Sequence, residues 1–237
     1  MDDTEFDRAL IAAAFEVAAQ RGWHRMRVAD AARHAALPLD RARARFPGRG
    51  VVLIRFGRLA DQNALAGVIA EGPVRDRLFD ILMRRIDVLQ AHRPGVLALL
   101  QALPCDPPLA LMLAAANLCS MGWMLDGAGI PATGPRGRLR TKGLLGVWLW
   151  TVRAWRHDES LDLAATMAAL DHALARAEHA ESWLHPRRPP ARAPRPHEAP
   201  VAEGEAPEPP APAPPAPEPP PTEPSSEPPL GPPPDVS

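Results

Sequence analysis

The sequence has no tyrosine, only two cysteines and, among 27 basic residues, a single lysine. Neither Cys105 nor Cys119 lies in a Cys-x-x-Cys pair, which excludes a disulfide framework or a paired-cysteine redox site. Both lie in apolar surroundings, so we expect them to be buried as small apolar side chains. Motifs for a hydrolase nucleophile, a phosphate-binding loop, a dinucleotide fold or a zinc protease are also missing. The sequence therefore predicts no enzyme, no cofactor and no metal site.

Strand signals are missing as well. There is no alternating apolar–polar segment of useful length, and β-branched runs are few. The sequence therefore predicts an all-α fold. Glycine and proline breakers place the first four helices at about 5–19, 28–35, 39–45 and 50–70. Thr4 and Asp7 have the spacing of a capping box at the first of these.

Proline is concentrated at the C-terminus, where residues 186–237 hold 22 of the 31 prolines and no aromatic residue. Such a segment cannot bury enough apolar surface to offset its ordering entropy. We expect a disordered, acidic tail after about residue 185.

The formal net charge of −1 conceals a basic segment near the N-terminus. Residues 20–60 contain ten arginines against two aspartates. A segment with that excess of positive charge favours a polyanion, meaning nucleic acid or an anionic membrane surface.

Two short expected helices, 28–35 and 39–45, are separated by the residues Ala-Leu-Pro. Together with the helix before them they form a predicted helix-turn-helix module. Arginines four residues apart share a helix face and can contact guanine or phosphate. This interpretation requires free guanidinium groups, and ion pairs within the protein would count against it. The candidate DNA-contacting residues are Arg27, Leu39, Arg41, Arg43, Arg45 and Arg49.

The same segment resembles the N-terminal module of TetR-family transcriptional regulators. An amphipathic helix ends in Arg-Gly-Trp at residues 21–23, "RVADAARHAAL" follows at residues 27–37, and Phe46 and Arg49 are in register. The resemblance implies an all-α dimer that binds operator DNA and is released by a small apolar ligand. Ala36 replaces the turn glycine of the family, Pro38 its N-cap serine, Arg43 its tyrosine and Arg45 its histidine.

A second resemblance covers much of residues 74–178. It is to lipid-binding accessory proteins of ubiquinone biosynthesis, which have the TetR fold and bind aromatic isoprenoids. The alternative function is therefore isoprenoid lipid binding. The matching residues are Thr141, Lys142, Trp155, Asp158, Ser160, Asp162, Thr166, Leu170 and Asp171.

These resemblances imply three parts: a helix-turn-helix module at 1–60, a helical ligand-binding and dimerisation domain at 61–185, and the tail at 186–237. The longest apolar stretch, residues 109–125, contains Asn117 and Ser120. We interpret it as a buried core helix, not a membrane span, and expect a cytoplasmic protein without stable membrane insertion. The candidate ligand-pocket residues are Met112, Asn117, Ser120, Met121 and Met124; for any one of them, core packing is the alternative.

The last two expected helices carry a candidate homodimer interface, for which an intramolecular pair is the alternative. The final helix should start near Asp158 or Ser160 and has apolar residues at four-three spacing. Trp148 and Trp150 should point to different faces of the preceding helix. The candidate interface residues are Trp148, Val152, Trp155, Leu163, Met167, Leu170 and Leu174.

Overall fold

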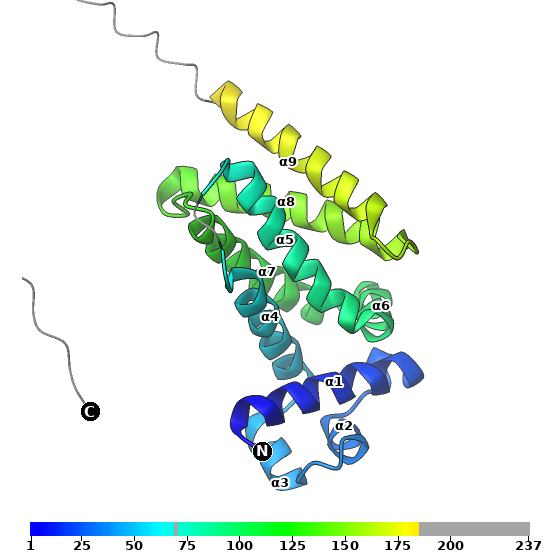
Figure 1. The fold of residues 1–237 in the computed structure, drawn as a ribbon. Coiled ribbons are helices and arrows are strands. Elements are labelled where there is room, and N and C mark those ends of the chain that lie inside the picture. The colour runs from blue at the N-terminus through cyan, green and yellow to red at the C-terminus, as the bar shows by residue number, and fades with distance from the viewer. Residues whose placement is uncertain (69–70, 185–237) are drawn as a thin grey trace, which may run out of the picture. The chain divides into compact units, whose positions relative to one another are not determined.

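The computed structural model describes residues 1–68 and 71–184, which form nine α-helices and two short 3-10 helices (Figure 1). No strand occurs in this part of the chain, which confirms the all-α prediction. The predicted disordered tail lies outside the described residues. The helices are α1 (Asp3–Arg21), α2 (Val28–His34), α3 (Leu39–Arg45), α4 (Arg49–Leu65), α5 (Val74–Ala91), α6 (Arg93–Ala102), α7 (Pro107–Gly127), α8 (Gly134–His157) and α9 (Ala164–Leu184), with 3-10 helices at Trp23–Arg25 and Leu103–Cys105.

The first helix begins earlier than its capping-box spacing indicated. The carboxylate of Asp2 accepts a 2.6 Å hydrogen bond from the backbone N–H of Glu5, so Asp2 is the N-cap instead of Thr4. Asp7 is thereby free to bind elsewhere. The helix ends at Gly22, whose φ of 82° is one that glycine adopts without steric cost.

The helices α1, α2 and α3 lie together at one end of the described residues, and α4 leads from them to the remaining helices (Figure 1). The turn between α2 and α3 contains Ala36 with a φ of 51°, a left-handed conformation in which a side chain is strained. This is the position at which the resemblance places glycine. Leu37 is buried in the same turn and fixes it to the core.

A single apolar core runs from Phe6 in α1 to Leu174 in α9. One close approach lies between α1 and α6, where a Cβ atom added at Gly95 would sit 2.3 Å from the carbonyl oxygen of Phe15. The neighbouring His92 ring stacks on Phe15, with centroids 5.6 Å apart. The first helix is thus packed directly against the C-terminal helices. The proposed division at residue 60 falls inside α4, which is continuous there.

The start of α9 is held by Asp158. One carboxylate oxygen accepts hydrogen bonds from the backbone N–H and hydroxyl of Ser160, and the other accepts from the N–H and hydroxyl of Thr166. These bonds, led by the one from the Ser160 hydroxyl, lower the pKa of Asp158 to about 2. The helix itself begins at Ala164, a few residues after the predicted start.

Three further expectations were wrong. The fourth helix ends at Leu65, whereas its predicted end at residue 70 lies outside the described residues. Both cysteines are exposed, although they were expected to be buried. The apolar helix α7 is only partly buried: Leu111 is 74% exposed. By length and composition α7 could cross a membrane, a test that a helix of a soluble protein also passes.

Candidate nucleic-acid interface

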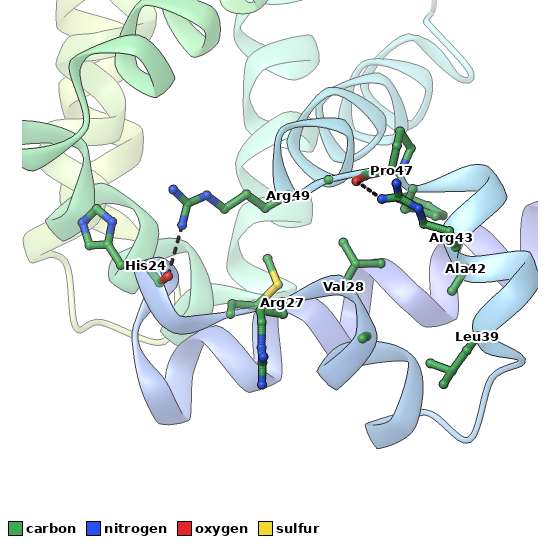
Figure 2. A pocket seen from close by; sticks show the side chains of 12 residues that line it. His24, Arg27, Val28, Leu39, Ala42, Arg43, Pro47 and Arg49 are labelled. Carbon is green, nitrogen blue, oxygen red and sulfur yellow. Dashed lines mark hydrogen bonds between the residues drawn. The ribbon is translucent and has the colours of Figure 1, made fainter.

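A hollow of about 530 Å³ lies between the start of α2, helix α3 and the start of α4 (Figure 2). Four of the six predicted DNA-contacting residues line it: Arg27, Leu39, Arg43 and Arg49. They come from three separate elements that the helix-turn-helix fold brings together. The structure therefore places most of the predicted contact residues around one concave surface.

Of the three arginines of the hollow, Arg27 and Arg49 each pair with one carboxylate, and Arg43 bonds to a backbone carbonyl. Arg43 donates to the carbonyl oxygen of Pro47 at 2.9 Å, and Arg49 donates to that of His24 at 3.1 Å (Figure 2). A carbonyl bond orients a guanidinium group without neutralising its charge. Arg49 also lies 3.2 Å from a carboxylate oxygen of Asp106, and Arg27 lies 3.0 Å from Asp30.

The N-terminus of α4 adds to the positive potential of the hollow. Gly48 precedes the helix and provides no side-chain cap, so the first N–H groups of this 17-residue helix have no side-chain acceptor at that position. The helix dipole favours an anion at such an end. Gly48 and Arg49 both line the hollow, so a phosphate group there would meet backbone donors and a guanidinium together.

Arg41 and Arg45 lie on the opposite side of α3, against α1, and their guanidinium groups are not free. Arg41 donates to Asp3 at 2.5 Å, and its guanidinium carbon lies 4.4 Å from the centroid of the Phe6 ring. Arg45 donates to both carboxylate oxygens of Asp7, at 2.7 and 2.9 Å, and to Asp3 at 2.6 Å.

Asp7 is shared with a second arginine, since Arg55 of α4 also pairs with it. Burial of Asp7 raises its pKa, but the bonds from Arg45 and the charge of Arg55 outweigh that effect and leave the pKa lowered. The bond to Asp7 in turn raises the pKa of Arg45. Asp3 and Asp7 thus fasten α3 and α4 to α1, and these ion pairs count against the prediction that Arg41 and Arg45 contact DNA.

The outward face of α3 offers a different set of side chains. Leu39 is 45% exposed, and Asp40, Arg43 and Ala44 are exposed beside it. Residues 39 and 43 are one turn apart, as are 41 and 45, but the two pairs point about 200° apart around the helix. Helix α3 therefore presents one arginine to the outside.

The predicted ligand-pocket residues lie in different environments. Met121 and Met124 are fully buried, and Met112 lies against Gly50. Asn117 donates to the carbonyl oxygen of Leu113 one turn earlier, at 2.8 Å. Ser120 donates to Asp61 of α4 at 2.6 Å. A pocket formed by this set remains a prediction.

The predicted dimer-interface residues pack inside the protomer because α9 lies along α8. Five of them are covered by this chain itself, with exposures of 6% or less: Trp148, Trp155, Leu163, Leu170 and Leu174. Val152 and Met167 are half-buried. The five buried residues offer little surface to a partner, which counts against them as interface residues, while Val152 and Met167 stay candidates. The prediction that Trp148 and Trp150 point to different faces is confirmed, with Trp148 buried and Trp150 52% exposed.

Two sets of interacting residues were not predicted from the sequence. Asp3 and Asp7 are one turn apart on α1 and match the spacing of Arg41 and Arg45, but only the packing of α1 against α3 shows that the pairs meet. Arg85 of α5, 3% exposed, pairs with Asp61, and no signal in the sequence marks it as buried. In the described residues, no group of three or more His, Cys, Asp or Glu side chains could hold a metal ion.

The fold is that of TetR-family transcriptional regulators. The TetR regulator from Nitrosomonas europaea superposes with a TM-score of 0.61 at 21% identity, over 74% of this chain and 99% of that one. A TetR-family regulator from Streptomyces coelicolor superposes with a TM-score of 0.54 at 17% identity, over 75% and 84% of the two chains. At these identities the likeness establishes the fold alone. No family model and no curated protein matches the sequence.

Proposed function

We propose that this protein is a transcriptional regulator that binds operator DNA as a homodimer, acts as a repressor and is released by a small apolar ligand. The observation that carries the proposal is the hollow lined by Arg27, Arg43 and Arg49 at the N-terminus of α4. It combines the positive charge and backbone donors that hold a DNA phosphate, next to the outward face of α3. Arg41 and Arg45 have a structural part in this proposal and do not contact DNA.

The proposal is tested by DNA-binding measurements on the purified full chain. Fluorescence anisotropy with the DNA upstream of its gene should show tighter binding than with random DNA of equal length. Three phosphate contacts per subunit give six per dimer, and therefore a log–log salt slope of about −5. The triple variant R27A/R43A/R49A should lose binding, whereas the control Arg176→Ala, at an exposed arginine of α9, should not.

Equal affinity for upstream and random DNA would contradict a specific regulator. Unchanged binding by the triple variant would show that the hollow is not the contact surface. Thermal unfolding of each variant must accompany the measurement, because a misfolded protein would lose affinity for another reason.

We place the dimer interface on the outward face of α8, in place of the buried residues discussed above. Leu139, Gly143, Gly146 and Trp150 follow one another at four-three-four spacing on that face. Nothing lies within 4 Å of a Cβ atom added at either glycine, so a second helix could approach closely there. Trp150→Asp should convert a dimer to a monomer in sedimentation measurements. Leu161→Asp, at a fully exposed apolar residue beyond α8, is the matched control.

One observation favours the alternative, a lipid-binding accessory protein of ubiquinone biosynthesis. Leu111 and Trp123 of α7 are 74% and 66% exposed, on a helix that contains no charged residue before Asp126. Such a face suits an isoprenoid chain. Mass spectrometry of organic extracts from the purified protein would reveal bound isoprenoid quinone, and an extract without quinone would reject this alternative.

A further inference from the structure

A buried polar cluster joins the four helices α4, α5, α7 and α8. Its centre is Arg85 of α5, which is 3% exposed. The Nε atom of Arg85 lies 3.0 Å from a carboxylate oxygen of Asp61 in α4. The second oxygen of Asp61 accepts a 2.6 Å hydrogen bond from the hydroxyl of Ser120 in α7. The Arg85 guanidinium carbon lies 4.4 Å from the centroid of the Trp148 ring of α8.

The guanidinium group of Arg85 has hydrogen-bond donors without a partner in the described residues. The Nη1 atom of Arg85 is buried and has no hydrogen-bond partner in the described residues. The Oδ2 atom of Asp61 accepts from Ser120, whereas its Oδ1 atom and the Nε atom of Arg85 are in ion-pair contact without a hydrogen bond. A buried donor without an acceptor is unfavourable, and native proteins rarely keep one.

We propose that Arg85 anchors the effector, a neutral apolar molecule with one hydrogen-bond-accepting oxygen, through its Nη1 donor. The inference rests on the proposed function, because it names the ligand that the regulator would sense. It differs from the predicted pocket in its central residue, since the sequence pointed to α7 alone.

The charges of the cluster define the class of effector. Arg85 and Asp61 balance each other, so a carboxylate ligand would add an uncompensated negative charge to a buried site. An amine would place a second positive charge beside the guanidinium. A ketone or ester oxygen accepts a hydrogen bond from Nη1 and leaves the balance unchanged.

The surroundings require an apolar body on the same molecule. Ile81, Leu82 and Ile86 of α5 and Met121 and Met124 of α7 are fully buried on the helices that supply Arg85 and Ser120. Methionine side chains are unbranched and flexible, so they can repack around an alkyl chain. The effector therefore combines a hydrocarbon chain with a single carbonyl group.

The cluster has a direct route to the DNA-binding hollow. Asp61 belongs to α4, and Arg49 at the other end of this helix lines the hollow. A ligand that changes the contact between Arg85 and Asp61 acts on the helix that carries a phosphate-binding residue.

Calorimetry on the full chain tests the anchor without DNA, with 2-nonanone, nonanoate and nonylamine as probes of equal chain length. We expect 2-nonanone to bind at least tenfold more tightly than the two charged probes. Arg85→Met should weaken 2-nonanone binding at least tenfold, whereas Arg176→Met, at an exposed arginine of α9, should leave it unchanged.

A second variant controls for misfolding caused by an unpaired Asp61. D61N/R85M removes both charges together, so no lone carboxylate is left in the core, and it too should lose the affinity for 2-nonanone. The proposal is overturned if either variant binds 2-nonanone as the wild type does, if a charged probe binds equally well, or if the wild type binds none of the three. DNA binding is measured separately. If the protein binds 2-nonanone through Arg85 but does not bind DNA, the anchor role of Arg85 stands and the proposed regulator function is rejected. If it binds DNA but not 2-nonanone, only the anchor role of Arg85 is rejected.

Discussion

Replacement of Gly95 by alanine tests the contact between the first helix and the C-terminal helices. The new Cβ atom would lie 2.3 Å from the carbonyl oxygen of Phe15 and 2.7 Å from both its carbonyl carbon and its Cβ. An ordinary contact needs about 1 Å more. Two of these three atoms are backbone atoms that no side-chain rotation can move, so α6 must shift away from α1.

The expected cost follows from two opposing effects. Overpacking of this kind destabilises by about 1–3 kcal/mol, and the backbone contact favours the upper part of that range. The higher helix propensity of alanine offsets up to about 1 kcal/mol of this loss in the free energy of unfolding. We expect a net loss of about 2 kcal/mol, which in a chain of this size lowers the melting temperature by about 4–8 °C.

Gly57 provides the matched control for the same substitution. It lies inside α4, and nothing is within 4 Å of a Cβ atom added there. Gly57→Ala should therefore raise stability by up to about 1 kcal/mol through helix propensity. Both variants are compared with the wild type by thermal and urea unfolding at one protein concentration. If Gly95→Ala were as stable as the wild type, the close packing of α1 and α6 described here would be wrong.

Three further substitutions test local features. Ala36→Gly removes the strain of a left-handed alanine, so we expect urea unfolding to show a gain of about 0.5–1 kcal/mol; a loss would indicate an unstrained turn. Asp158→Asn weakens the cap of α9 and should cost about 1–2 kcal/mol at pH 7. Because folding lowers the pKa of Asp158 from 3.8 to about 2, the wild-type advantage should be complete above pH 4 and disappear as the pH falls to about 2. A difference independent of pH would exclude the carboxylate as its source. Arg45→Ala should lower the melting temperature more than Arg43→Ala does, since Arg45 binds Asp3 and Asp7 while Arg43 binds one backbone carbonyl. Equal melting temperatures would contradict a structural part for Arg45.

Local features of the fold could be predicted from the sequence because their causes are local. Breakers and apolar periodicity located the three N-terminal helices and the turn between α2 and α3. The opposite orientations of Trp148 and Trp150 follow from helix geometry alone. The hollow could be anticipated in part, because Arg27, Leu39, Arg43 and Arg49 all belong to one short module.

The remaining features depend on which surfaces meet. Arg45 and Asp7 are 38 residues apart in the sequence, and periodicity assigns each to a helix face without showing what that face contacts. The four-three spacing of α9 has the same limit. It predicts an apolar seam, but a seam packs equally well against α8 of the same chain or against a partner. Burial of Leu170 and Leu174 within the protomer decides the question for those residues.

The division of arginines on α3 has a consequence for how DNA would be read. Arg41 and Arg45 hold the helix against Asp3 and Asp7, and that rigidity keeps Leu39 and Arg43 in a fixed position on the outer face. With one arginine presented by α3 of each subunit, direct base readout is limited to few positions. Most of the affinity must then come from phosphate contacts, which carry no sequence information. We therefore expect a steep dependence of binding on salt, together with a ratio of specific to non-specific affinity near the lower end, about 10³, of the usual range.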